Sequence, residues 1–339
     1  MAVLVAGWCG ACGSPANGAR AGCGAPFRVG MVTGVVDRAD QTFDAAFWQG
    51  VVDRVDTDGD LCVRAQYVES SQPADFAPNI RLFAAQGYRL IVTAGPALVP
   101  ATVAAARAHP GVRFATLDPG SPVANSPPNL TPVRFRQDEA GFLAGALAGL
   151  TTRTGVVGAV FGPTDDARVH RYGEGFRQGA LFVHPGVRVL VVYASRSPGV
   201  VSDAEWGSAR ARDELQRGAD VIMGGGGDAG QGALLAAGQA RRLCVGTAVD
   251  VFYSEPQVRG CLLTSAVVNV SGAVETLALR ASHPSRTGSE GLVMSVANGG
   301  AGLAPFHWLS SRVPARIRDH LQRIADQLAD GTLATGVAA

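Results

Sequence analysis

The chain has 339 residues, of which 47% are hydrophobic, and its 29 basic and 28 acidic residues leave a net charge of +1. This length suits two lobes better than one hydrophobic core, and the balanced charge gives no overall attraction to nucleic acid or to an anionic membrane. Every basic residue is arginine. Without lysine, Schiff-base chemistry and a phosphate-binding loop lysine are both excluded.

Residues 1–26 predict a truncated signal and lipoprotein tether. Ala2–Gly7 resembles the end of a secretory apolar segment, but no basic residues precede it, so we expect the true start upstream. Cys12 follows two small residues, as the acceptor cysteine of a lipoprotein does, and is the candidate for lipidation. The alternative is a disordered tail with incidental cysteines. No later stretch holds 18 uninterrupted apolar residues, so no membrane span is expected.

From Phe27 onward, short apolar runs alternate with helical patterns, which is typical of βαβ units. Several runs are apolar at consecutive positions, as buried parallel strands require. Between them, Asp138–Leu150 predicts a helix with one apolar face. The predicted strands are Arg28–Thr33, Leu61–Val68, Leu90–Thr93, Phe114–Asp118, Val156–Phe161, Val187–Tyr193, Val221–Met223, Cys244–Thr247 and Cys261–Ser265.

The stretch Pro119–Pro132 is rich in Pro, Ser and Asn, and it predicts the crossing between two lobes. Near the C-terminus, Val313–Leu328 predicts an amphipathic helix that stops at Gly331. The fold class is therefore α/β, with two doubly wound parallel-sheet lobes. Sheets of this kind bind ligands at the carboxyl ends of their strands.

Six segments, in the correct order, resemble the basic membrane protein (BMP) family of substrate-binding lipoproteins. The first, RVGMVTGVVDRADQTFDAAFWQG at 28–50, has the family's strand, a turn similar to D-x-S-F-N, and a helix with W-x-G. The likeness runs from about residue 27 to 333. The other segments are GYRLIVTAGPALVPATVAAARAHPGVRFATLD (87–118), DEAGFLAGALAGLTTRTGVVGAVFG (138–162), RYGEGFRQGA (171–180), GADVIMGGGGDAGQGAL (218–234) and GGAGLAPF (299–306).

The resemblance implies a type I periplasmic-binding-protein fold, whose two lobes are joined by a multi-strand hinge and close around one solute. Several members bind purine nucleosides and hand them to an ABC importer. We therefore expect an extracytoplasmic monomer, periplasmic or held at the membrane only by a lipid anchor, that serves an ABC permease and ATPase. Residues 1–26 would be the tether, 27–132 with about 270–290 lobe 1, and 133–269 with about 291–339 lobe 2. No cofactor, metal or catalysis is expected.

Sites of this family hold a base between aromatic rings and bind its edge and the ribose with carboxylates. Phe43 and Tyr172 stand at the family's aromatic positions, and stacking contributes ~1–3 kcal/mol per base. The matching carboxylates are Asp40, Asp44 (in place of the usual Asn) and Asp118. Without the resemblance, helix capping, a core role for the rings, and anchoring of the lobe crossing by Asp118 would fit these residues as well.

The second lobe would add backbone contacts at Gly226 and Gly227, which follow a strand. CVGTAVD at 244–250 resembles the family's G-V-D-S-D, so Ala248 falls where the ribose-holding Asp would be and only Asp250 survives. Asn269 stands where the family usually has Lys. Losing an anion and a cation together keeps the local charge balanced, which indicates altered specificity. Purine nucleoside is thus the default ligand, and a free base or another heterocycle should compete well.

Two other functions stay open. Gly225, Gly227 and Gly230 spell G-x-G-x-x-G between a strand and an apolar helix, and Asp250 follows twenty residues later. By pattern this is a dinucleotide fingerprint, which would indicate an NAD-linked oxidoreductase. A ligand sensor or regulator of the same fold, without an importer, also fits. The scattered histidines show no metal-ligand spacing.

Cys244 and Cys261 open two strands that we expect to be neighbours, about 4.8 Å apart. This separation is within the range that a disulfide tolerates, and an exported protein meets an oxidising environment. The alternative is a pair of buried free thiols, because free cysteine is among the most buried residue types.

Overall fold

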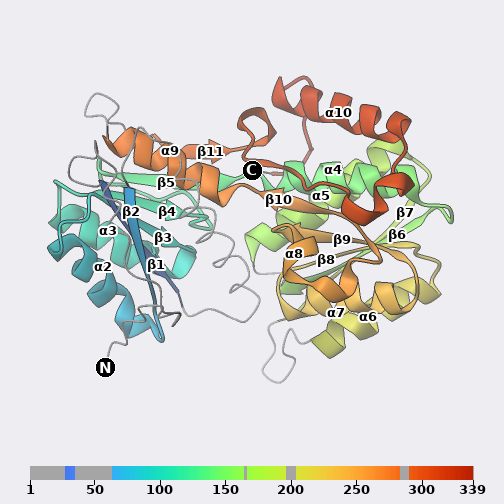
Figure 1. Cartoon of the computed structure of the whole chain (residues 1–339), viewed down its shortest axis with the longest axis horizontal. Coiled ribbons are helices and arrows are strands. Elements are labelled where there is room, and N and C mark those ends of the chain that lie inside the picture. The colour runs from blue at the N-terminus through green and yellow to red at the C-terminus, as the bar shows by residue number, and fades with distance from the viewer. Residues whose placement is uncertain (1–26, 35–62, 164–165, 196–203, 283–289, 339) are drawn as a thin grey trace, which may run out of the picture.

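The computed structural model describes residues 27–34, 63–163, 166–195, 204–282 and 290–338. It has two lobes that lie side by side, each with a six-stranded sheet between helices (Figure 1). This confirms the predicted fold class. The first eight predicted strands form within two residues of their predicted ends, and the ninth ends three residues later than predicted.

The sheet of the first lobe is entirely parallel, in the order β11-β5-β4-β3-β1-β2. Alternate residues of β3 pack on opposite faces: Ile91 joins the helices α2 and α3, whereas Leu90 and Val92 join α9. The elements are β1 (Phe27–Thr33), β2 (Val63–Glu69), α2 (Phe76–Ala85), β3 (Leu90–Ala94), α3 (Val99–Ala108), β4 (Arg113–Leu117), β5 (Leu130–Phe135), α9 (Val270–Ser282) and β11 (Leu292–Met294).

The sheet of the second lobe has the order β12-β10-β9-β8-β6-β7, and within it only the pairing of β10 with β12 is antiparallel. Helices α4 and α5 cover one face, and α6 and α7 cover the other. The elements are α4 (Gln137–Thr151), β6 (Val156–Pro163), α5 (Ala167–Val183), β7 (Arg188–Ala194), α6 (Ala204–Gln216), β8 (Val221–Gly225), α7 (Asp228–Gln239), β9 (Leu243–Ala248), α8 (Val251–Ser254), β10 (Leu262–Val268), β12 (Ala301–Leu303) and α10 (Ala315–Ala329). Short 3-10 turns occur in both lobes, at Pro73–Asp75 and Pro96–Leu98 in the first and at Pro256–Val258, Val296–Asn298 and His307–Arg312 in the second.

Glycines explain the close contact of α4 with α5. A side chain at Gly145 would collide with the backbone carbonyl of Phe176, and one at Gly179 would collide with that of Phe142. The small residues in these two segments therefore let the helix backbones touch. The predicted C-terminal helix is confirmed as α10, which lies over α4 (Figure 1) and buries Ile317, Leu321, Ile324 and Leu328.

The chain passes between the lobes later than the sequence indicated. The Pro-rich stretch is a loop of the first lobe, because the amide of Asn129 donates to the carbonyls of Ala106 (2.9 Å), His109 (3.1 Å) and Val112 (2.9 Å). The chain then continues through β5 in the same sheet and crosses only between Phe135 and Gln137. Two more crossings follow β10 and β11. The strand β11 belongs to the first sheet, although we assigned residues from about 291 onward to lobe 2.

Cys244 and Cys261 are joined by a disulfide, with their Cα atoms 5.3 Å apart. The backbone N–H of Cys244 also donates to the carbonyl of Cys261 at 2.7 Å. The bond therefore ties the start of β9 to the segment that enters β10.

Candidate functional site

All three crossings between the lobes leave from the carboxyl ends of strands, namely β5, β10 and β11. The carboxyl edges of both sheets therefore lie at the junction of the lobes, where open α/β sheets bind ligands. Asp118 follows β4 at this edge in the first lobe, and Gly226 and Ala248 mark the ends of β8 and β9 in the second.

Asp118 lies at the centre of a buried polar network that joins the lobes. Its backbone is in the left-handed region (φ 45°), and its side chain is 6% exposed. Oδ1 accepts from the backbone N–H of Phe135 (3.3 Å), and Oδ2 accepts from Nε2 of Gln137 (2.7 Å). Arg171 on α5 donates from Nε to Oε1 of Gln137 (2.9 Å), and its Nη2 lies 4.0 Å from Oδ1 of Asp118. A carboxylate of lobe 1 is thus linked to a guanidinium of lobe 2 through the first crossing.

Burial raises the pKa of Asp118 from 3.8 to about 6, although the charges of Arg168 and Arg171 oppose this rise. Arg168 is itself paired with Asp166, its Nη2 lying 2.7 Å from Oδ2. The two arginines therefore keep Asp118 ionised near neutral pH although its burial favours the neutral form. A carboxyl group with a shifted pKa is typical of functional sites.

Tyr172 is 5% exposed and packs in the core beside α4. Its hydroxyl has no hydrogen bond of standard length and angle within the described part of the chain, but it faces the backbone N–H of Ala248, which acts to lower its pKa. Burial, together with the negative charge of Asp118, raises the pKa of this phenol, so the group is neutral. A buried hydroxyl with only a weak partner costs free energy, so a ligand group that bonds to it well would be favoured. Tyr172 is therefore a core residue whose hydroxyl is also a candidate contact for a ligand.

Gly226 and Gly227 follow β8 in left-handed conformations (φ 71° and 93°). Gly227 is the N-cap of α7 and supplies no side-chain cap, so the first N–H groups of this helix have no acceptor from the N-cap residue. Gly230 packs against the backbone of Gly225, where a side chain would collide. The structure therefore contains the strand, glycine turn and helix on which the dinucleotide interpretation was based.

Asp250 and Asn269 are occupied by local contacts. Asp250 caps α8 by accepting from the N–H of Phe252 (3.3 Å), and its Oδ2 lies 2.8 Å from Nε2 of His307. A dinucleotide ribose would have to displace one of these contacts. Asn269 accepts from the N–H of Gly272 (2.9 Å) and donates to the carbonyl of Gly299 (3.2 Å), which links two crossings. Ala248 is left-handed (φ 69°) although it is not glycine.

The structure brings together Asp118 and Tyr172 at the lobe junction but places Asp250 and Asn269 in capping and hinge roles. Asp40, Phe43, Asp44 and Cys12 lie outside the described residues. The sequence reasoning missed Gln137 and Arg171. Arg171 precedes Tyr172 within RYGEGFRQGA, so a polar residue beside a proposed site residue was the available signal.

Two α/β lobes joined by several crossings, with a buried polar network where they meet, define the class of two-lobed solute-binding proteins. The chain belongs to the Bmp family, described as "ABC transporter substrate-binding protein PnrA-like", whose profile matches residues 27–327. It is an ABC transporter substrate-binding protein, and proteins of this class work outside the cytoplasm. Among the described residues, no helix is long and apolar enough to cross a membrane.

Known relatives agree with this assignment. The chain is 27% identical over 341 residues to the CD4+ T-cell-stimulating antigen of Listeria innocua, covering 94% of this chain and 92% of the relative. It is 28% identical over 206 residues to the ABC transporter nucleoside-binding protein BmpA of Lactococcus lactis, covering 60% and 56% of the two chains. The solved structure of an ABC transporter solute-binding protein from Conexibacter woesei has the same fold, with a TM-score of 0.76, 23% identity, and coverage of 91% and 98%.

Proposed function

We propose that the protein binds an uncharged, nucleoside-like heterocycle between its lobes, closes around it, and delivers it to an ABC permease and ATPase without catalysing a reaction. The observation that carries this proposal is the buried network of Asp118, Gln137 and Arg171. It holds an ionised acceptor at the carboxyl edge of the first sheet and connects that acceptor to the first crossing between the lobes, which supports a ligand site there.

The charges around the junction favour a ligand without net negative charge. Arg171 faces Asp118, Arg168 is paired with Asp166, and Asp250 contacts His307. Each arginine of the site thus already has a carboxylate, and a phosphate would bring a further anion without a cation to meet it. A heterocycle or sugar with N–H or O–H groups can donate to Asp118 and to the weakly bonded hydroxyl of Tyr172.

The ribose contacts are the part we expect to differ from other family members. Ala248 has no polar side chain, and Asp250 and Asn269 are engaged in capping and hinge contacts. A free base or another heterocycle should therefore compete well against its nucleoside. We also propose Phe43 and Tyr172 as the aromatic contacts, Asp40 and Asp44 as further acceptors, and Cys12 as the lipid anchor of a monomeric protein.

The test is a thermal-shift screen over nucleosides, free bases and related heterocycles, followed by calorimetry on any compound that stabilises the protein. A ligand at a hundred times its Kd should add ~2.7 kcal/mol to the stability. NAD(H) and nucleoside monophosphates serve as controls and should cause no shift. Tight binding of the monophosphates in preference to the nucleosides, or saturable binding of NAD(H) that is lost on changing Asp250, would contradict the proposal.

A further inference from the structure

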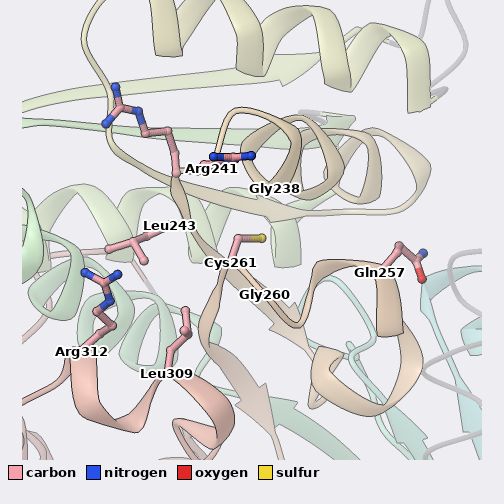
Figure 2. A pocket seen from close by; sticks show the side chains of 9 residues that line it. Gly238, Arg241, Leu243, Gln257, Gly260, Cys261, Leu309 and Arg312 are labelled. Atoms are coloured by element: carbon pink, nitrogen blue, oxygen red, sulfur yellow. The ribbon is translucent and has the colours of Figure 1, made fainter.

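A cavity of about 330 Å³ lies in the second lobe, and Figure 2 shows the side chains that line it. Leu243, which begins β9, and Cys261, which directly precedes β10, both line it. The lobe crossing and the candidate ligand site lie at the opposite, carboxyl ends of these strands, at Ala248 and Asn269. The cavity is therefore separate from the site proposed above, and the inference goes beyond that function.

All the charged residues that line this cavity are basic. Arg241, Arg242 and Arg312 line it, and no lining residue is acidic. Within the described residues, none of these three arginines forms an ion pair with a carboxylate. Gln257, which lines the cavity, donates from its amide to the carboxylate of Glu255. In Figure 2, Arg241 and Arg312 lie on different segments with Cys261 between them. Cationic side chains thus come from two parts of the chain to one cavity.

Arg241 adopts a backbone conformation that is unfavourable for a residue with a side chain. Arg241 follows α7 in the left-handed conformation (φ 53°), and its N–H donates to the carbonyl of Gly238 (3.0 Å). The next N–H, of Arg242, donates to the carbonyl of Ala237 (2.9 Å). This is the helix-ending turn in which glycine is usual, because glycine adopts positive φ without a steric penalty. The fold tolerates this conformation at Arg241, which places the residue in the lining of the cavity.

The walls of the cavity are held in place by the disulfide. Cys261 lines the cavity, and its bond to Cys244 fixes the segment that carries Arg241 and Arg242 against the Gly260 turn. The backbone that carries these arginines is therefore fixed, whereas their exposed side chains would be ordered by the ligand.

We propose that this cavity binds a phosphate group. A guanidinium presents a planar fork of N–H donors that matches two phosphate oxygens, and arginine cannot lose its charge at neutral pH. The phosphate could come from two sources, free phosphate and its soluble esters or the headgroups of an anionic membrane. The chemistry that recognises them is the same, so the experiment has an arm for each.

The decisive variant is Arg241→Gly. Glycine suits the left-handed turn, so this variant should melt at a temperature equal to or higher than the wild type while it loses one cation of the cavity. Arg312→Gln removes a cation from the other segment. Arg323→Gln is the matched control, since Arg323 is exposed on α10 and does not line the cavity.

Binding of inorganic phosphate is measured by calorimetry at constant ionic strength, and vesicles of phosphatidylglycerol or phosphatidylcholine are tested by co-sedimentation. We expect saturable binding of phosphate or of phosphatidylglycerol vesicles, weakened about tenfold or more by Arg241→Gly and Arg312→Gln and unchanged by Arg323→Gln. Which arm responds identifies the source. Absence of both, or equal weakening by all three variants, would overturn the proposal, and neither result depends on the ligand of the lobe junction.

Discussion

Replacing Asp118 by Asn should stabilise the protein while it weakens ligand binding. Asp118 is almost fully buried, and burial raises its pKa from 3.8 to about 6. An acid whose pKa is raised by folding is stable in its protonated form, so its contribution to stability is complete below pH 3.8 and is lost as the pH rises to 6. Asn resembles the protonated acid and does not titrate.

The size of the effect follows from the pKa difference. A rise from 3.8 to about 6 corresponds to about 3 kcal/mol of lost stability at pH 7. Asn can offer its one oxygen to either Phe135 or Gln137, and its NH₂ then faces the other donor, which forfeits ~1 kcal/mol. The variant should therefore be about 2 kcal/mol more stable at pH 7. Its affinity for the ligand should fall by ~1.5–3 kcal/mol, the usual worth of a hydrogen bond to a charged group.

The assay is denaturant unfolding of both proteins from pH 4 to pH 7.5, together with calorimetry of ligand binding at pH 7. The stability advantage of Asp118→Asn should shrink as the pH falls toward 4. Asp319→Asn, at an exposed position on α10, is the control and should show little change at any pH. If Asp118→Asn were less stable than the wild type at pH 7, Asp118 would stabilise the fold through its ion pair. If it bound ligand normally, Asp118 would not belong to the site.

Tyr172→Phe removes a buried hydroxyl whose only facing group is the weakly bonded N–H of Ala248, so the stability of the ligand-free protein should change by less than about 1 kcal/mol while calorimetry shows weaker ligand binding. Tyr172→Ala should lose ~1–3 kcal/mol of ligand affinity. Normal affinity in both variants would make the ring purely structural. Burial raises the pKa of Glu214 from 4.5 to about 9, so its contribution to the stability of the fold falls as the pH rises between these values, by up to about 1.4 kcal/mol per pH unit. In denaturant unfolding from pH 5 to pH 8, Glu214→Gln should therefore become increasingly stable relative to the wild type. Parallel stability curves for the two proteins would contradict this. Alkylation of unfolded protein without reductant should label neither Cys244 nor Cys261, whereas labelling of both would show free thiols. Changing both residues to Ser should lower the stability of the fold by ~3 kcal/mol, given their separation of 17 residues.

Most of the strands that the sequence predicted correctly are apolar at consecutive positions, although the edge strand β2 was also predicted and carries exposed Arg64 and Gln66. The strand β5 was missed because Pro132 lies inside it, and proline normally argues against a central strand. The structure accommodates this proline because β11 begins its pairing only at Val133, so Pro132 lies beyond the paired part of β5 on that side. β11 and β12 have three residues each, too few to show any periodicity.

Asp118 could be predicted because it follows an apolar strand at the edge where ligands bind. Its partners could not, since Gln137 lies 19 residues away, and Arg171 lies 34 residues beyond Gln137 in the other lobe. Asp250 and Asn269 show the reverse problem. A polar residue just before a helix can cap that helix or contact a ligand, and sequence spacing is the same for both roles. Only the coordinates of Phe252, His307 and Gly272 separate them.

The proposed site and the hinge share residues, and this gives the ligand a direct means of moving the lobes. Asp118 holds the N–H of Phe135 and the amide of Gln137, and these two residues bound the first crossing. If the proposed ligand displaces the amide of Gln137 from Asp118, it also disturbs the bond between Gln137 and Arg171 of the second lobe. On this proposal binding would change contacts that join the lobes, and a ligand can shift the equilibrium only through such differential contacts. On this argument, variants of Gln137 should alter lobe closure even if Gln137 never touches the ligand.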